Sequence, residues 1–527
     1  GSGTEIERRV PTRTAPRPAD RAVPAPPVAP AEPAALTPFT LAGVVVDGAT
    51  AIDPVRFVPL YESMIATTVT ADDLARLTRA IGDAYRDAGY ALATAYIPAQ
   101  AITAGVVHVR VVEGHVESIA FGGGPGDAAI VRHTLRAVTA ERPLTLATLE
   151  RRLLLLNDIP GVRVADARMR AVDVERGAYE LILDLRAVPF DALATLDNRG
   201  TRSNGPWQLW AGGGANLLLG DGAWRVHAGA LTNPASPREI RYGTAGVQRT
   251  LGSNGTMLRA MVGASDNVAG KPLSDSGVET ASLRFIAGAS HPLLRSRTRS
   301  LWVTGSFDVQ RATENRFGAD WSRDDLRVLR ASTYLFQADP WGGENGLNLE
   351  GSLGLDILGA SSAGIDRSRS DASGRFAKLR ADAVRTQRLF GPFSAQLQLS
   401  GQIANRSLLS AEEFSLGGAR YGRAFEPSEL AGDRGWAGSA ELRWSNPVRF
   451  DERVETELFA FADTGVVWND QLGKDPREHL SSAGAGVRLR FQSWIRVAAE
   501  VATPLDSSSR DLRRQGPRAF LSVAFEY

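Results

Sequence analysis

The stretch FSAQLQLSGQI, residues 393–403, alternates between apolar or small side chains and polar ones. Successive side chains of a β-strand point to opposite faces, so this pattern predicts a sheet with one apolar surface and one hydrated surface. In a soluble sandwich the apolar surface faces a core, whereas in a transmembrane barrel it faces lipid and the polar surface lines the lumen. The rest of the chain has to decide between these two classes.

The same alternation recurs through residues 188–527, which carry almost no helical period. An even number of antiparallel strands closes into a barrel with both ends at one rim. The last predicted strand ends on Tyr527, and aromatic residues gather at the interfaces of outer-membrane barrels. We predict sixteen strands, at 190–197, 206–216, 223–231, 238–250, 256–265, 278–288, 299–310, 325–336, 346–356, 375–386, 393–404, 436–446, 454–468, 482–491, 495–504 and 517–527.

Charged side chains on one face of these strands favour a membrane barrel. In the tenth strand Lys378, Arg380 and Asp382 alternate with apolar residues. Such charges are costly to bury in a dry core, and a hydrated lumen removes that cost. A large soluble sandwich also alternates, because a period of two identifies a strand and not its surroundings. The charges, the even spacing and the terminal aromatic residue together favour a 16-stranded antiparallel transmembrane β-barrel.

The composition excludes several other classes of protein. A net charge of +1 gives no field that attracts nucleic acid, so no nucleic-acid partner is expected. The chain has no cysteine, which removes disulfides, zinc thiolates and thiol catalysis together. It has neither an apolar run of about 18 residues nor a phosphate-binding GxxxxGK[ST] motif. We therefore expect no transmembrane helix, no nucleotide hydrolysis and no cofactor.

The first 187 residues predict a linker and two small α/β modules. Residues 1–36 are rich in proline and alanine and predict an extended linker. Residues 37–114 combine strands with a helix capped by Thr70 and Asp73, and residues 115–187 combine strands with one helix. The apolar stripes of these helices are formed by Leu74, Leu77, Ile81 and Tyr85 in the first and by Leu149, Leu153 and Leu156 in the second.

The longest unpatterned segment of the barrel region is residues 405–435, between the eleventh and twelfth strands. Long loops in compact barrels are usually functional or disordered, and glycine permits unusual backbone turns. Glu441 follows in the twelfth strand, and Phe461, Asp463 and Gly465 share one face of the thirteenth. The loop contains Gly417, Gly418, Tyr421, Gly422, Arg423, Ala424 and Phe425, followed by Gly432 and Asp433.

In this order the motifs resemble the outer-membrane transporters of two-partner secretion, within the Omp85 superfamily. The family has two POTRA domains before its barrel, and residues 37–114 and 115–187 resemble the first and the second. The family's loop arginine is followed by glycine, whereas Arg423 is followed by Ala424, so the turn at the tip is expected to differ. The POTRA resemblance rests on Tyr85, Gly89, Tyr90, Pro98, Gln100, Gly105, Glu113 and Gly114, and on Leu149, Glu150, Asn157, Asp158, Pro160 and Gly161.

The resemblance implies a mechanism. The long extracellular loop of the family folds back into the lumen, where its arginine pairs with an aspartate of a later strand; carried over, Arg423 contacts Asp463. Phe461, Gly465 and Glu441 then support the loop from the wall. The protein is expected in the outer membrane of a Gram-negative bacterium, in contact with lipid and as a monomer. Its POTRA domains, in the periplasm, are expected to capture an unfolded secreted protein for export through the pore.

Other interpretations remain open from the sequence. Arg423 can be one solvated loop charge among many, and Asp463 can simply line the lumen. An Omp85 insertase that assembles other barrels shares the fold, although insertases commonly carry more POTRA domains. An outer-membrane hydrolase needs a positioned serine, histidine and acid, and the chain has neither a GxSxG nor an HExxH motif. We therefore expect a transporter and not an enzyme.

Overall fold

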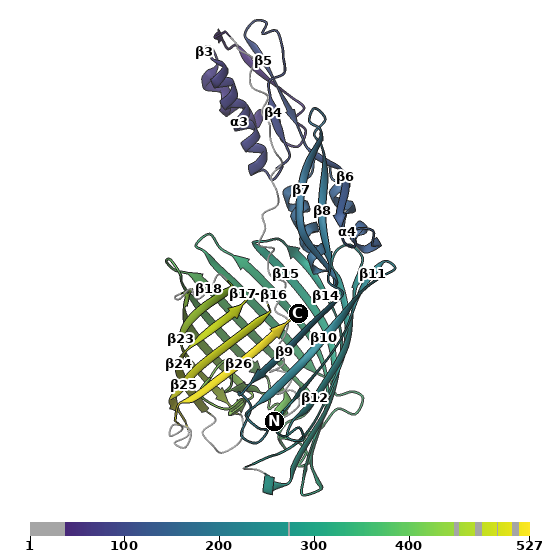
Figure 1. Cartoon of the computed structure of the whole chain (residues 1–527), viewed down its shortest axis with the longest axis vertical. Helices are drawn as coiled ribbons and strands as arrows, with labels where there is room; N and C mark the ends of the chain where they lie inside the picture. The colour runs from purple at the N-terminus through teal and green to yellow at the C-terminus, as the bar shows by residue number, and fades with distance from the viewer. Residues whose placement is uncertain (1–36, 272–273, 447–452, 470–476, 493, 509–515) are drawn as a thin grey trace.

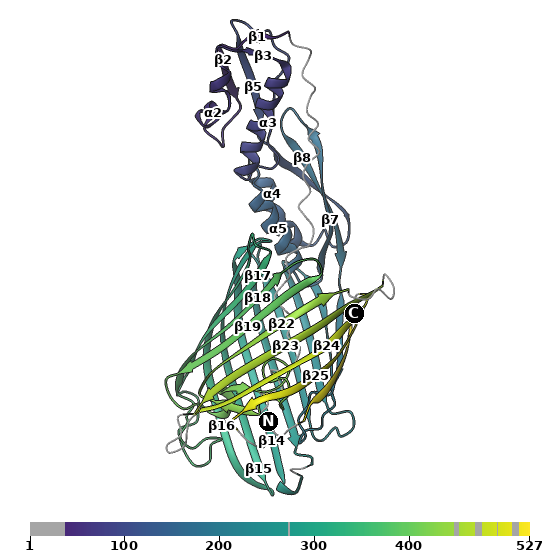
Figure 2. The same cartoon turned by 90° about the vertical axis from the view of Figure 1, so that its left-hand side faces the viewer.

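The computed structural model describes residues 37–271, 274–446, 453–469, 477–492, 494–508 and 516–527. It consists of two small modules, one after the other, followed by a barrel (Figures 1 and 2). The predicted linker, residues 1–36, lies outside the described residues. No helix among the described residues has the length and apolar character needed to cross a membrane.

The first module packs α3 (Ala71–Asp87) against a three-stranded sheet in the order β2-β5-β4. The predicted N-cap is present, because Thr70 and Asp73 exchange hydrogen bonds as a capping box. The core lies between the apolar stripe of α3 and the sheet. The other elements are β1 (Phe39–Thr40), β2 (Gly43–Asp47), η1 (Pro54–Phe57), α2 (Val58–Tyr61), η2 (Glu62–Met64), β3 (Thr68–Val69), β4 (Thr94–Tyr96) and β5 (Val106–Val112).

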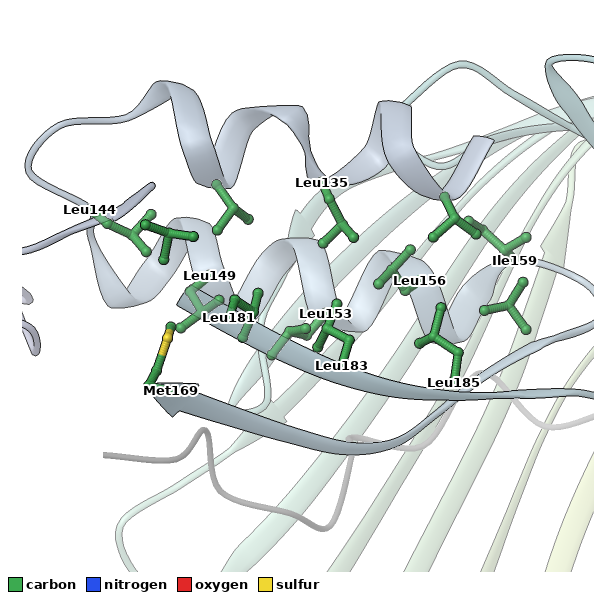
Figure 3. Close-up of a cluster of buried hydrophobic side chains, with 14 of the residues drawn as sticks. Leu135, Leu144, Leu149, Leu153, Leu156, Ile159, Met169, Leu181, Leu183 and Leu185 are labelled. Atoms are coloured by element: carbon green, nitrogen blue, oxygen red, sulfur yellow. The ribbon is translucent and has the colours of Figure 1, made fainter. Parts of the chain in front are cut away.

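The second module packs two helices on a sheet in the order β6-β8-β7. Its strands are β6 (His115–Gly123), β7 (Val162–Asp173) and β8 (Ala178–Ala187). Figure 3 shows leucines of the helices packed against Leu181, Leu183 and Leu185 of β8. The sequence predicted α5 (Leu146–Asp158) but not α4 (Ala129–Ala140), so the expectation of one helix was wrong. The cap of α4, Ala128, makes no side-chain hydrogen bond, and the usual start signal is therefore missing.

Sixteen antiparallel strands form a closed barrel, as predicted. The first and last strands pair along residues 193–197 and 522–526, which closes the ring. Several strands, β16 above all, extend further than the sequence indicated. The strands are β9 (Phe190–Asp197), β10 (Gln208–Leu219), β11 (Gly222–Thr232), β12 (Arg241–Leu251), β13 (Thr256–Val268), β14 (Val278–Arg295), β15 (Arg299–Arg316), β16 (Ala319–Ala338), β17 (Gly343–Gly354), β18 (Phe376–Arg388), β19 (Phe393–Ala404), β22 (Arg434–Ser445), β23 (Val454–Trp468), β24 (Arg477–Phe491), β25 (Ile495–Ser507) and β26 (Arg518–Glu526).

The barrel is apolar outside and polar inside. In β19 the side chains of Leu399 and Ile403 are exposed, at 59% and 62%, whereas Ser400 and Gln402 are buried. A soluble protein buries its large apolar side chains, so this inversion fits a wall in contact with lipid. The inner surface is correspondingly lined with charged and polar groups.

Helix α5 fixes the second module to the adjacent rim of the barrel, called the near rim below. Asp158 and Arg295 form a two-point ion pair, at 2.8 and 2.9 Å, and both side chains are almost fully buried. Glu150 accepts a hydrogen bond from Arg297 at 2.8 Å. Arg152 donates to the carbonyl of Ser253 in another turn of the same rim. These contacts join the module to the wall at several points, and the opposite, far rim carries the long loop.

Candidate functional site

The long loop, residues 405–433, folds back into the barrel from the far rim. It contains η4 (Ser410–Glu412) and a small hairpin of β20 (Phe414–Leu416) and β21 (Leu430–Gly432). The hairpin packs against the inner face of β22 and β23. Gly465 leaves space for it, because a side chain there would collide with Leu416. The resulting buried cluster comprises Phe414, Leu416, Tyr421, Ala424, Phe425, Leu430, Ala437, Phe459, Phe461, Val467, Leu480, Ala502 and Phe520.

Glycines shape the tip of the loop. Gly417 and Gly422 have φ angles of +105° and +70°, which side-chain-bearing residues rarely adopt, and Gly418 is similar at +93°. A side chain at Gly417 would also collide with the carbonyl oxygen of Glu426. Ala424, which stands where the family has glycine, is fully buried and is not left-handed. The tip therefore accommodates Ala424 without backbone strain.

Arg423 lies at the centre of the site, and its nearest carboxylate is Glu441. Its Nη1 donates to Glu441 Oε2 at 2.9 Å, and its guanidinium lies 4.0 Å from the centre of the Phe461 ring. The expected partner, Asp463, is within reach but further away, with 3.8 Å between Nε and Oδ2. Glu500 is a third acid within reach, with 3.7 Å between Nη1 and Oε2, so the partner named from the sequence is one of three and not the nearest.

Asp463 holds the backbone of the tip. Its Oδ1 accepts hydrogen bonds from the N–H of Gly422 at 2.7 Å and from the hydroxyl of Ser482 at 2.6 Å. The N–H of Arg423 lies 3.5 Å from Oδ2. A fully buried carboxylate needs such donors, since an unpaired charge is costly away from water. Asp463 thus fixes the path of the chain, while Glu441 binds the guanidinium.

Glu441 is shared by three arginines. Besides Arg423, it accepts hydrogen bonds from Arg443 at 2.7 Å and from Arg488 at 2.9 and 3.0 Å. Arg488 also contacts Glu457 at 2.6 Å. The loop arginine therefore joins a network that already exists on the barrel wall, and Glu441 is the nearest of the three carboxylates that face it.

The base of the long loop is held by a second group of charges. Asp433 accepts a hydrogen bond from the N–H of Leu408 at 2.7 Å, which joins the two ends of the loop. Arg369, from the 355–375 loop between β17 and β18, contacts Asp433 at 2.6 Å and Glu413 at 2.7 Å. The adjacent Gly432 is buried where a side chain would press on Trp468. All three charged side chains are at most 10% exposed.

Glu412 fixes the same region to the barrel wall. It pairs with Lys378 of β18 and with Arg330 of β16, both at 2.6 Å. Burial would raise the pKa of Glu412, but the two cations hold that pKa far below its usual value. The sequence placed Lys378 among the charged side chains on the lumen face of its strand. It did not indicate the roles of Arg330 and Arg369, or that Glu441 binds three arginines. Their partners lie on other strands or in another loop, up to 82 residues away along the sequence.

A polar cavity of about 240 Å³ lies beside the loop tip within the lumen. Its lining includes four arginines and two glutamates: Arg199, Arg423, Arg443, Arg488, Glu441 and Glu500. The loop thus occupies part of the lumen at this level, and the cavity beside it is lined by charged side chains.

Comparisons with known proteins agree with this architecture. The model of the family described as haemolysin secretion/activation protein ShlB/FhaC/HecB matches residues 182–489, and a ShlB-type POTRA domain matches residues 39–114. The heme/hemopexin transporter protein HuxB of Haemophilus influenzae is 23% identical over 85% of this chain and 80% of its own length. The outer membrane transporter CdiB of Escherichia coli is 25% identical over 87% and 80%.

Solved structures show the same fold. CdiB from Escherichia coli superposes with a TM-score of 0.74 at 21% identity, covering 93% of this chain and 91% of that one. BamA from Haemophilus ducreyi, lacking its POTRA domains 1–3, gives 0.52 at 13% identity over 93% of this chain and all of that one. The chain belongs to the haemolysin secretion/activation protein family ShlB/FhaC/HecB and is an outer-membrane transporter of two-partner secretion, with its POTRA region in the periplasm.

Proposed function

We propose that the long loop is the gate of the transporter and that Arg423 and Asp463, with Glu441, form its latch. In the closed state the loop lies within the lumen and blocks it. An unfolded secreted protein, held on the periplasmic modules, passes when the loop leaves the wall. The observation that carries this proposal is the burial of Arg423, a loop residue, against three carboxylate-bearing strands of the inner wall: β22, β23 and β25.

The latch is suited to a reversible gate. An ion pair in a hydrated lumen costs less to break than one in a dry core, because water can solvate both charges after separation. The guanidinium leaves with the loop, whereas Glu441 remains on the wall beside Arg443 and Arg488, which keep it paired. Opening therefore leaves Glu441 paired, while Asp463 keeps the hydroxyl of Ser482 and exchanges the N–H of Gly422 for water of the lumen. Closing restores a fixed geometry.

The periplasmic modules offer a place for the client. In the second module β7 is an end strand of its sheet, and in the first module β2 and β4 are end strands. An end strand can add a strand of another chain through main-chain hydrogen bonds, which accepts many sequences at modest affinity. This mode suits a client that has to be captured unfolded and then released. The transporter is proposed to act as a monomer and without a catalytic step.

Export is proposed to be driven by folding of the client outside the cell. The test is a client variant that cannot fold externally, expressed with the unchanged transporter and compared with the normal client. Much reduced release into the medium is expected. Undiminished release of the folding-defective client would overturn this part of the proposal.

The alternative of an insertase predicts a different phenotype. The likeness to BamA shows the fold and leaves the activity open. Deleting a transporter removes one secreted protein from the medium, whereas deleting an insertase depletes many outer-membrane proteins. Proteomic comparison of the medium and the outer membrane, with and without this chain, separates the two. An assay for detergent-activated esterase activity tests the remaining alternative, a barrel hydrolase.

A further inference from the structure

The base of the long loop and its tip are held in different ways. The tip is latched to the wall of the lumen through Arg423 and Asp463, and Glu426 beyond it pairs with Arg202 between β9 and β10, whereas the base contacts a different extracellular loop. That other segment is the 355–375 loop between β17 and β18. The two loops share an apolar cluster with the far end of β16, formed by Leu326, Val328, Ala372, Phe376, Leu408, Leu409 and Ala411.

The 355–375 loop is itself fixed to β16. The N–H of Ser361 donates to the carbonyl of Asp325 at 2.9 Å, and the N–H of Ser368 donates to the carboxylate of Asp324 at 3.0 Å. The N–H of Arg323 donates to the carbonyl of Asp366 at 2.9 Å. Several hydrogen bonds to a barrel strand make this loop a rigid support and not a free segment.

Arg369 projects from that support to both ends of the long loop. Its Nη1 donates to the carbonyl of Leu408 at 3.2 Å, near the start of the loop, and its guanidinium contacts Asp433 at 2.6 Å, at the end. Glu413 lies between them, at 2.7 Å. A planar guanidinium can donate in several fixed directions at once, so one side chain sets the position of both ends.

We propose that Arg369 is a positioning residue that makes the long loop a hinged gate: it anchors the base at the far rim, so that the tip can leave the lumen and return to the same place. This inference rests on the proposed function and adds to it a fixed end and a moving end. The hairpin of β20 and β21 moves as a unit about residues 413 and 433. The base stays against the 355–375 loop throughout.

The test uses the ion current through single proteins in planar lipid bilayers, which needs no client. Arg369→Gln removes the anchor and is expected to raise the time-averaged leak current about tenfold, because the tip finds its latch less often. Arg369→Lys keeps the positive charge but not the planar guanidinium, so its leak current should lie between those of Arg369→Gln and the unchanged protein. Arg375→Gln is the matched control, since Arg375 is an exposed cation of the same loop.

A disulfide provides the decisive variant. The chain has no cysteine, and the N–H of Ser410 lies 3.1 Å from the hydroxyl of Ser368, so Ser368→Cys with Ser410→Cys can link the base to its support. Added to Arg369→Gln, the oxidised pair should return the leak to the level of the control, and reduction should release it again. Heat-modifiable migration on gels verifies that each barrel is folded. A leak of Arg369→Gln equal to that of Arg375→Gln, or a leak that the disulfide does not lower, would overturn the inference and leave the transport function untouched.

Discussion

The three-arginine arrangement around Glu441 predicts that removing this acid opens the gate more than removing the loop arginine itself. In Glu441→Gln, Arg423 loses its nearest carboxylate and still faces Arg443 and Arg488. The charge centres of a guanidinium and a carboxylate in direct contact are roughly 5 Å apart, so at an effective dielectric constant of about 20 the lost attraction is roughly 3 kcal/mol. The closed state should lose about 3 kcal/mol, a factor of about 100 in the closed-to-open ratio.

Arg423→Gln has a smaller expected effect. Glu441 keeps Arg443 and Arg488 as partners, and Asp463 keeps the donors Gly422 and Ser482, so no buried charge is left unpaired. The loss is the charge-assisted hydrogen bond to Glu441 and the contact with the Phe461 ring, together worth about 2 kcal/mol, or about 30-fold in the same ratio. The double variant is the sharpest case. Removing Arg423 from the Glu441→Gln protein removes the repulsion and should partly close the gate again.

The assay is the time-averaged leak current in planar bilayers, with heat-modifiable migration as the control for folding. The expected order is Glu441→Gln first, the double variant second and Arg423→Gln third, with the unchanged protein lowest. An Arg423→Gln current equal to or above that of Glu441→Gln would refute the reasoning. So would a double variant that leaks more than Glu441→Gln.

Three further predictions concern the base, the tip and the periplasmic side. Burial raises the pKa of Glu413 to about 7 despite Arg369, and the carboxylates of Asp433 and Asp371 add to the rise. Because this pKa is raised above the ordinary 4.5, the anchored base is favoured below pH 4.5 over a base released from its support, and it loses up to about 3 kcal/mol of that preference as the pH passes 7. The leak should therefore rise from pH 5.5 to 8 as the anchor loosens, and an equal rise in Glu413→Gln would contradict this. Gly417→Ala should increase the leak, because the added carbon would collide with the carbonyl oxygen of Glu426 and because Gly417 has a left-handed φ. Gly401→Ala is the control and should behave like the unchanged protein, since the nearest atom to the added carbon is 3.8 Å away. Equal leak currents of the two variants would count against the described turn. Asp158→Ala leaves Arg295 buried without its carboxylate, at a cost of about 3 to 5 kcal/mol. It should broaden the distribution of distances between spin labels on the second module and on the barrel rim, whereas Asp166→Ala, at an exposed position, is the control. An unchanged distribution would show that the ion pair does not fix the module.

Much of the fold could be predicted because its signals are local. A strand with one face in lipid and one in water has to alternate, and residues 393–404 and 454–468 were located to the residue for this reason. The capping box at Thr70 is likewise read from four neighbouring positions. Helix α4 escaped because its cap, Ala128, gives no such signal.

The partners within the site were harder to predict. The order of the motifs along the chain identified Arg423 and Asp463, and both lie in the site. The assignment of the guanidinium to Glu441 depends on the register of β22 against β23, where Glu441 lies opposite Phe461 and Ser439 opposite Asp463. Register is set by pairing across the sheet, so a single strand does not reveal it. The contacts of Arg369 join two loops and had no local signal at all.

The central claim is that the loop tip has to leave the lumen for the client to pass. The most direct measurement is secretion by Ala424→Cys with Ser482→Cys, since the N–H of Ala424 lies 3.4 Å from the hydroxyl of Ser482 and the chain has no other cysteine. Secretion of the client should stop when this pair is oxidised and resume on reduction, while either single cysteine secretes normally. Normal secretion by the fully crosslinked protein would contradict the account.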